Sequence, residues 1–202
     1  MNHLAHVFLS GKDENLMMGN LIADFVTGSE ARLCNPKFLK GIQLHYFIDV
    51  FTDSHPTVKE STKKLHPYHH KYAPVVIDVF YDFFLAKNWP YYAQQMDLNL
   101  DMRSFINQTY DVLEKNKSDF PEKLSKPLPN MIKNDWLYQS TQMEGQKKVF
   151  SMLEKRTKYE SNFNNAVNHL IEFQDELEKE FNIFFPELIS AVSHQLSAVK
   201  LI

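Results

Sequence analysis

Apolar residues recur at the three-to-four-residue spacing of an α-helix along almost the whole chain. No segment alternates polar and apolar residues in the way that a half-buried strand does. The chain of 202 residues contains only 5 glycines, which argues against a glycine-rich sheet or a dinucleotide-binding fold. Because neither an internal repeat nor a long linker divides it, we expect an all-α, single-domain helical bundle over residues 1–202.

Prolines, glycines and capping residues set the expected helix boundaries. Gly28 suits the position just after a helix, Pro36 suits a first turn, and Pro186 should kink or break the last helix. The β-branched run 75–77 would also suit a strand, but the length of its apolar segment favours a helix. The expected helices cover about 14–27, 36–52, 72–88, 101–115, 131–140, 144–155 and 159–198.

Charge and cysteine content exclude several classes of protein. With 22 basic and 25 acidic residues, the formal net charge of −3 predicts no nucleic-acid partner. The single cysteine, Cys34, cannot form an internal disulfide, and the N-terminus lacks the features of a secretory signal. No apolar run approaches the length of a membrane span. We therefore expect a cytoplasmic protein, and the sequence leaves its oligomeric state open.

His45, Asp49 and Asp53 are spaced i, i+4, i+8 and would lie along one face of a helix. A histidine and an aspartate one turn apart can bind one metal ion, or the aspartate can orient the histidine. The same spacing also occurs in ion pairs on a solvated helix face. The pattern therefore nominates His45 and Asp49 without deciding their role.

Other acids and histidines interrupt apolar segments. Asp78 and Asp82 are one turn apart in the most apolar expected helix, where two buried carboxylates call for a cation between them. A narrow solvated stripe or pairing with lysines would also explain them. Asp24 stands among apolar residues that could end an amphipathic helix, and His6 could be a packed or surface histidine.

Together these residues predict a metal site inside the bundle. Imidazoles and carboxylates without a thiolate suit Mn, Mg, Fe or Zn rather than a structural zinc site. Such an ion acidifies bound water and neutralises charge on a phosphoryl group. No serine or cysteine nucleophile motif competes with this hypothesis. The candidate residues are His6, Asp24, His45, Asp49, Asp78 and Asp82.

A basic segment, residues 59–71, follows the expected helix 36–52. It is either a solvated face or a docking patch for an acidic partner, and His69 or His70 could instead add a metal ligand. Its lysines are Lys59, Lys63, Lys64 and Lys71, and its histidines are His66, His69 and His70.

Four segments in this order resemble the acyl carrier protein phosphodiesterase family: MNHLAH, GNLIADFVTG, GIQLHYFIDVFTDSHP and APVVIDVFYDFFLAKNW. The DWL motif at 135–137, the segment around Arg156 and FFPEL at 184–188 are also similar. That family is regarded as an irregular branch of the HD phosphohydrolases, which are all-helical and metal-dependent. The resemblance thus implies an HD-domain-like fold with the metal site in about 1–90 and a helical C-terminal half in about 100–202.

The resemblance implies hydrolysis of 4′-phosphopantetheine from holo acyl carrier protein to give the apo form, with Mn²⁺ as the favoured metal. It makes His6 the first metal ligand and Asp24 the acid of the His-Asp pair, although Ala23 stands where that pair has its histidine. Asp78 or Asp82 would be the final acid.

His45 would then be an extra ligand or, with Asp49, a catalytic pair. Arg156 is the candidate phosphate contact, and the four lysines are the candidate dock because acyl carrier protein is acidic.

The chain also departs from the family pattern. Tyr46 and Phe47 stand where relatives tend to carry basic residues, and Phe83 follows Asp82 where relatives tend to have histidine. Two other hypotheses therefore stay open: a phosphohydrolase acting on a nucleotide or another small phosphoester, and a non-catalytic helical binding protein.

Overall fold

The computed structural model describes residues 1–125 and 127–198. Over these residues the chain forms α- and 3₁₀-helices joined by turns, with no strand, which confirms the predicted all-α class. The first half contains α1 (His3–Leu9), α2 (Glu14–Ile22), α3 (Gly28–Ala31), α4 (Leu39–Ser54), α5 (Pro56–His69), α6 (Ala73–Lys87) and α7 (Trp89–Gln95). The second half contains α8 (Met102–Lys115), α9 (Glu122–Ser125), α10 (Pro127–Lys133), α11 (Trp136–Gln139), α12 (Met143–Glu154) and α13 (Ala166–Ala198).

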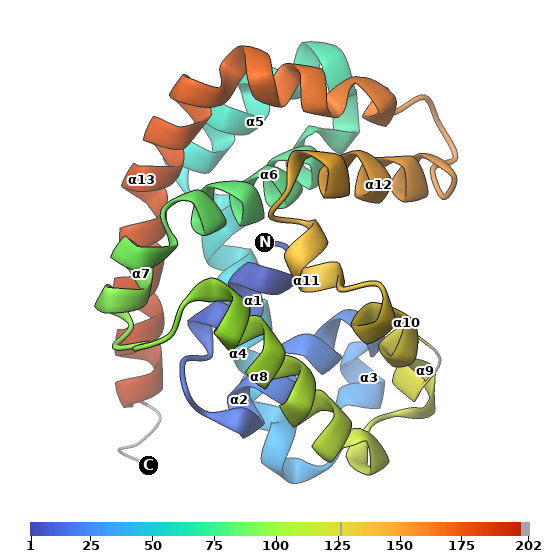
Figure 1. Cartoon of the computed structure of the whole chain (residues 1–202), viewed down its shortest axis with the longest axis vertical. Helices are drawn as coiled ribbons and strands as arrows, with labels where there is room; N and C mark the ends of the chain where they lie inside the picture. The colour runs from blue at the N-terminus through green and yellow to red at the C-terminus, as the bar shows by residue number, and fades with distance from the viewer. Residues whose placement is uncertain (126, 199–202) are drawn as a thin grey trace.

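The long helix α13 runs across the top and down one side of the molecule (Figure 1). Helices α5, α6 and α12 lie in the upper part, and α2, α3, α8, α9 and α10 lie in the lower part (Figure 1). The short helix α1 lies between them with all its residues from Leu4 to Leu9 buried. The N-terminus consequently starts in the middle of the fold rather than at its edge (Figure 1).

Two glycines allow α2 and α4 to touch backbone to backbone. A Cβ atom on Gly19 would lie 2.8 Å from the Gly41 Cα, and one on Gly41 would lie 2.7 Å from the Gly19 Cα. Real side chains do not tolerate such distances, so any larger residue would push the two helices apart. Gly41 lies inside α4, at the crossing that brings Asn20 against His45.

Asp82 holds α1 against α6. Its carboxylate accepts hydrogen bonds from the backbone N–H groups of Leu4 (3.3 Å) and Ala5 (3.1 Å), which have no partner within their own helix. The Asn2 side chain (2.8 Å) and the Ser140 hydroxyl (2.9 Å) also donate to it. A buried acid from another helix thus caps α1, and this cap fixes the position of His6.

Helix α13 is attached to α5 by polar contacts. Lys64 forms ion pairs with Glu176 and Glu180, at 2.6 and 3.3 Å. The Ser61 hydroxyl donates to Glu180 at 2.6 Å. These contacts fix α5 in place beside α4.

The predicted helices 72–88, 101–115 and 144–155 agree with α6, α8 and α12 to within one residue at each end. The last helix begins at Ala166 rather than at 159, and α1, α5 and α7 were not predicted. Thr27 caps α3 with a capping box, so Gly28 begins that helix instead of following the previous one. The expected helix 131–140 is divided at Asp135, whose φ of 52° is left-handed. Helix α13 contains Pro186 without a break. None of the helices in the described ranges is long and apolar enough to cross a membrane.

Candidate metal centre

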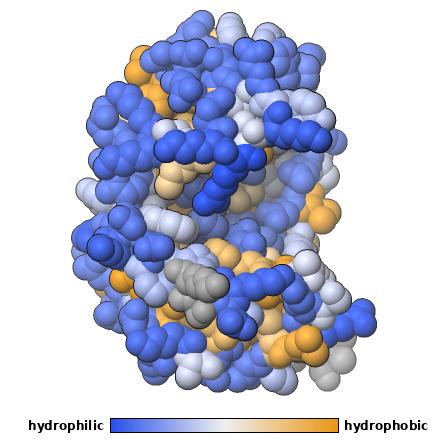
Figure 2. Space-filling view, turned by 90° about the vertical axis from the view of Figure 1, so that its right-hand side faces the viewer, coloured by the Kyte–Doolittle hydropathy of each residue, from blue (hydrophilic) through white to orange (hydrophobic). Residues whose placement is uncertain are grey.

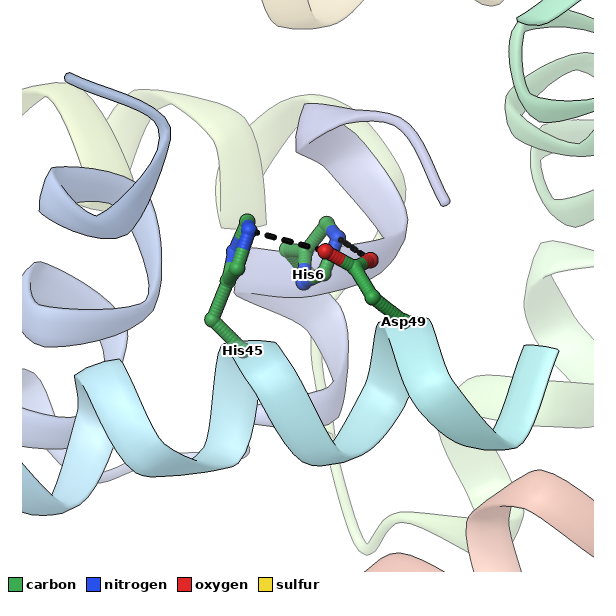
Figure 3. A group of neighbouring side chains, drawn as sticks. All are labelled: His6, His45 and Asp49. Carbon is green, nitrogen blue, oxygen red and sulfur yellow. Dashed lines mark ion pairs between the residues drawn. The ribbon is translucent and has the colours of Figure 1, made fainter. Parts of the chain in front are cut away.

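His6 from α1 and His45 and Asp49 from α4 converge on one point (Figure 3). The His6 Nε2 lies 3.1 Å from Asp49 Oδ1, and the His45 Nε2 lies 3.1 Å from Asp49 Oδ2. The two imidazole rings stack with their centroids 4.1 Å apart. Both histidines are buried, whereas 38% of the Asp49 side chain is exposed. The site is therefore a buried pair of imidazoles with one accessible carboxylate.

Asn20 of α2 orients both imidazoles. Its side-chain oxygen lies 2.8 Å from the His6 Nδ1, and its backbone oxygen lies 2.9 Å from the His45 Nδ1. The Asn20 amide nitrogen donates to the His6 carbonyl (2.8 Å) and to the Ser10 hydroxyl (3.1 Å), which fixes the side-chain oxygen toward His6. Since both oxygens can only accept, each histidine carries its proton on Nδ1.

With the ring proton on Nδ1, the other nitrogen, Nε2, is the metal-binding atom of each histidine, and both Nε2 atoms face the Asp49 carboxylate. The His6 Nε2 is buried and has no hydrogen-bond partner, although it lies close to an Asp49 oxygen. Lone pairs in contact repel each other unless a cation lies between them, and neutral imidazoles held through their other nitrogen are ordinary metal ligands. The three residues therefore fit a divalent metal ion.

The ionisation of the site agrees with this fit. Burial lowers the pKa of His6 to about 4, so its imidazole is neutral at pH 7. Burial by itself would raise the pKa of Asp49, but His45, His6 and the Met1 ammonium group outweigh burial and lower that pKa. Neutral imidazole and ionised carboxylate are the forms that bind metals.

Asp24 lies at the edge of the cluster. Its Oδ1 is 3.7 Å from the His45 Nε2, and its Oδ2 is 2.8 Å from the His3 Nδ1. Burial would raise the pKa of Asp24, but its contact with His3 lowers the pKa more. Asp24 is therefore an ionised carboxylate that can join a metal held by His45 and Asp49.

Asp78 adjoins the cluster through the Met1 ammonium group, which lies 3.2 Å from Asp78 Oδ1 and 3.4 Å from Asp49 Oδ1. Burial raises the pKa of Asp78, and the ammonium group opposes that rise. Asp78 is thus placed beside the predicted ligands. Asp82 is not, because its oxygens are taken by the α1 cap, and burial raises its pKa to about 6.

The remaining candidates lie around the site. Arg156 is exposed near the end of α12. Lys59 and Lys63 are exposed on α5, whereas Lys64 is committed to its α13 glutamates. Lys71 lies over the Tyr159 ring, 3.5 Å from its centroid. Both ring nitrogens of His69 are used in hydrogen bonds to Ser161 and His169, so His69 is not a metal ligand of this cluster.

Two grooves meet at Asp78. The groove between α5 and α6 has a volume of about 770 Å³ and includes Asp53, Lys59, Lys63 and His66 in its walls. The groove between α6 and α10–α12 has a volume of about 910 Å³ and includes Met1, His3 and Arg156 in its walls. Figure 2, which views the molecule from the side of α10 and α12, shows a surface hollowed at mid-height. Asp78, next to the cluster, is therefore accessible from two sides.

The sequence did not nominate Asn20 or His3, which act through other residues. Asn20 lies in the GNLIADFVTG segment and is fully buried among apolar residues. A buried amide in an apolar helix normally has specific partners, so this environment was an available signal. Its two histidine partners come from distant segments, which a single sequence does not reveal.

Comparison with known proteins finds relatives of this chain. The relatives include the acyl carrier protein phosphodiesterase of Serratia proteamaculans (strain 568), 39% identical over 108 residues that make up 54% of each chain. Those of Salmonella paratyphi A and Escherichia coli O139:H28 are each 27% identical over 195 residues, covering 96% of this chain and 99% of theirs. No solved structure matches, so the HD-domain-like fold stays a prediction. The model of the family described as acyl carrier protein phosphodiesterase matches residues 1–188, and this chain therefore belongs to that family of hydrolases.

Proposed function

We propose that this chain is a metal-dependent phosphodiesterase that removes 4′-phosphopantetheine from holo acyl carrier protein and regenerates the apo form. Family membership supports the substrate, since the named relatives are acyl carrier protein phosphodiesterases. The observation that carries the metal dependence is the pair of Nε2 lone pairs, on His6 and His45, that face the Asp49 carboxylate.

In this reaction water adds to the phosphorus, and the bond from phosphorus to the serine oxygen of the carrier protein breaks. The serine oxygen leaves with a proton, and the arm leaves with its phosphate. A divalent cation, with Mn²⁺ favoured by the family resemblance, would supply an acidified water and neutralise phosphoryl charge.

The chain's own residues prepare the centre for this chemistry. Asn20 holds both imidazoles with Nε2 toward Asp49, and burial keeps His6 neutral. Asp24 adds an ionised oxygen beside His45. In the alternative role, His45 and Asp49 would act as an acid–base pair.

The groove between α5 and α6 supports a dock for the acidic carrier protein. Lys59 has no acidic partner among the described side chains, and Lys63 only approaches Glu60 at 4.0 Å on the surface. Both lysines line the groove that leads to Asp78. Lys64 and Lys71 contribute less, since one is ion-paired and the other lies on Tyr159. Carrier-protein affinity should fall with salt.

The test is incubation of holo acyl carrier protein with the protein and Mn²⁺, followed by mass spectrometry for loss of the phosphopantetheine arm. A panel of nucleotides and small phosphoesters runs beside it. Asp49→Ala should abolish the loss, whereas Asp111→Ala, an exposed aspartate on α8, should not affect it.

Three other results would contradict the proposal. Turnover of a small phosphoester with no loss of the arm would favour the alternative substrate. Turnover unchanged by metal chelation would favour the acid–base pair. No turnover and no metal binding would favour a helical binding protein.

A further inference from the structure

The groove between α6 and α10–α12 has walls of a distinct chemistry. Its apolar side chains come from three helices: Val75 and Val79 of α6, Trp136 of α11, and Val149 and Met152 of α12. Three side-chain amides, Asn130, Asn134 and Gln139, face the same space. An apolar groove with a few amides suits a ligand that alternates methyl or methylene groups with amide bonds.

Asp135 lies in the wall of this groove on a strained backbone. Its carboxylate pairs with Arg103. Its left-handed φ of 52° costs free energy for a residue with a side chain. A strained backbone position is a common feature of binding sites, and this one marks the groove as a candidate site.

The groove also carries positive charge. Lys133, Lys148 and Arg156 line it, are exposed, and have no acidic partner among the described residues. The groove between α5 and α6 also has lysines in its walls, but its apolar lining consists of Val58, Pro67 and Pro74. The two grooves thus offer different surfaces on either side of one aspartate.

Resting on the proposed function, we infer that the two grooves divide the substrate at Asp78. The groove between α6 and α10–α12 binds the 4′-phosphopantetheine arm, and the groove between α5 and α6 faces the carrier protein. The arm is a flexible chain with two amides, a gem-dimethyl group, a hydroxyl and a thiol, which matches apolar walls that carry side-chain amides. The volume of about 910 Å³ lies within the usual range of about 300–1,000 Å³ for such ligands.

The test measures binding of the two products separately, by calorimetry and by inhibition. Free 4′-phosphopantetheine reports on the arm groove, apo carrier protein on the other groove, and inorganic phosphate on the centre alone. Val75→Trp narrows the arm groove from an exposed helical position. Lys59→Glu with Lys63→Glu reverses charge in the other groove. Ile171→Trp and Lys179→Glu are matched controls at exposed positions outside both grooves.

Val75→Trp should weaken the binding of 4′-phosphopantetheine by about tenfold or more, since a bulky ring takes the space of the arm. It should leave the binding of apo carrier protein and of inorganic phosphate unchanged. The double lysine variant should weaken the binding of apo carrier protein and leave that of 4′-phosphopantetheine unchanged. If Val75→Trp fails to fold, Gln139→Leu replaces it with the same readout, because it removes an amide from the groove wall.

Unchanged binding of 4′-phosphopantetheine to the narrowed groove would overturn the inference. So would a loss of 4′-phosphopantetheine binding in the lysine variant alone. If the unmodified protein cleaves holo carrier protein in either case, the proposed function stands and only the division of the substrate falls. If it does not cleave holo carrier protein, both fall.

Discussion

Two buried histidine pairs in this molecule have opposite hydrogen-bond patterns. In the pair His69–His169, the His69 Nδ1 donates to the Ser161 carbonyl (3.0 Å), and the His169 Nδ1 donates to the His69 Nε2 (2.9 Å). In the pair His6–His45, both Nδ1 protons are used by Asn20 and both Nε2 atoms face a carboxylate. The first pair satisfies itself, whereas the second leaves both Nε2 atoms to the proposed cation. Histidine content alone therefore does not nominate a metal centre, whereas the direction of the ring nitrogens does.

The largest expected effect is on turnover. His45→Ala or Asp49→Ala should lower kcat/KM for holo carrier protein by about 10³-fold, since several kcal/mol of charge stabilisation is lost. His69→Ala should lower the melting temperature but leave kcat/KM of the folded protein within a few-fold. Comparable losses of kcat/KM in all three variants would remove the distinction between the two pairs.

The next effect separates two aspartates on α6. Asp82→Ala should lower the free energy of unfolding by about 3 kcal/mol, because four donors lose a buried acceptor. For a chain of this length that corresponds to a melting temperature about 6–12 °C lower. Asp78→Ala should lower stability less, since 32% of the Asp78 side chain is exposed and the Met1 ammonium group keeps Asp49 as a partner. Calorimetric melting of both variants decides the matter, and equal shifts would refute the division of roles.

The sequence predicted the fold class and most helices because apolar spacing and capping residues act locally. Asp101 caps α8, as its side chain suggested, by accepting from the Ser104 N–H. The sequence also nominated His6, Asp24, His45, Asp49 and Asp78, which the structure brings close together. It could not separate Asp78 from Asp82, because the same i, i+4 spacing serves a solvent-accessible acid and the cap of a helix 78 residues away.

Asn20 and Gly41 show the same limit. Both were present in the segments that carried the family resemblance, yet their roles depend on a helix crossing. A glycine inside a helix normally costs stability, and the close approach of Gly19 explains why Gly41 stands inside α4. Contacts between distant segments are what a single sequence lacks.

The pH dependence of stability should test the neutral, buried state of His6. The pKa of His6 is about 4 in the folded protein and 6.5 when unfolded, so the unfolded state binds more protons between these values. The contribution of His6 to the stability of the metal-free protein should therefore fall as pH falls from 6.5 to 4, whereas Asp82, with its pKa raised to about 6, contributes in the opposite direction. In His6→Gln that slope should decrease, by at most about 1.4 kcal/mol per pH unit. Denaturant titrations across this range measure the slope, and an unchanged slope would contradict the assignment of a neutral buried His6.

The smallest effect comes from the orienting residue. Asn20→Ala should weaken metal binding by about 10- to 100-fold, since it removes the side-chain acceptor of the His6 proton and leaves the backbone contact to His45. Ser140→Ala is the matched control, because it removes a buried hydrogen bond to Asp82 without touching either histidine. Metal titration followed by calorimetry measures both. Equal weakening in the two variants would show a general loss of stability rather than of orientation.

The most direct test of the metal centre is a titration of the chelator-treated protein with Mn²⁺, with Mg²⁺, Fe²⁺ and Zn²⁺ in parallel, followed by calorimetry and elemental analysis. The proposed metal centre predicts saturable binding of at least one of these ions. Asp49→Ala should abolish this binding, and His69→Ala should retain it. Binding that Asp49→Ala leaves unchanged, or no saturable binding of any of the four ions, would contradict it.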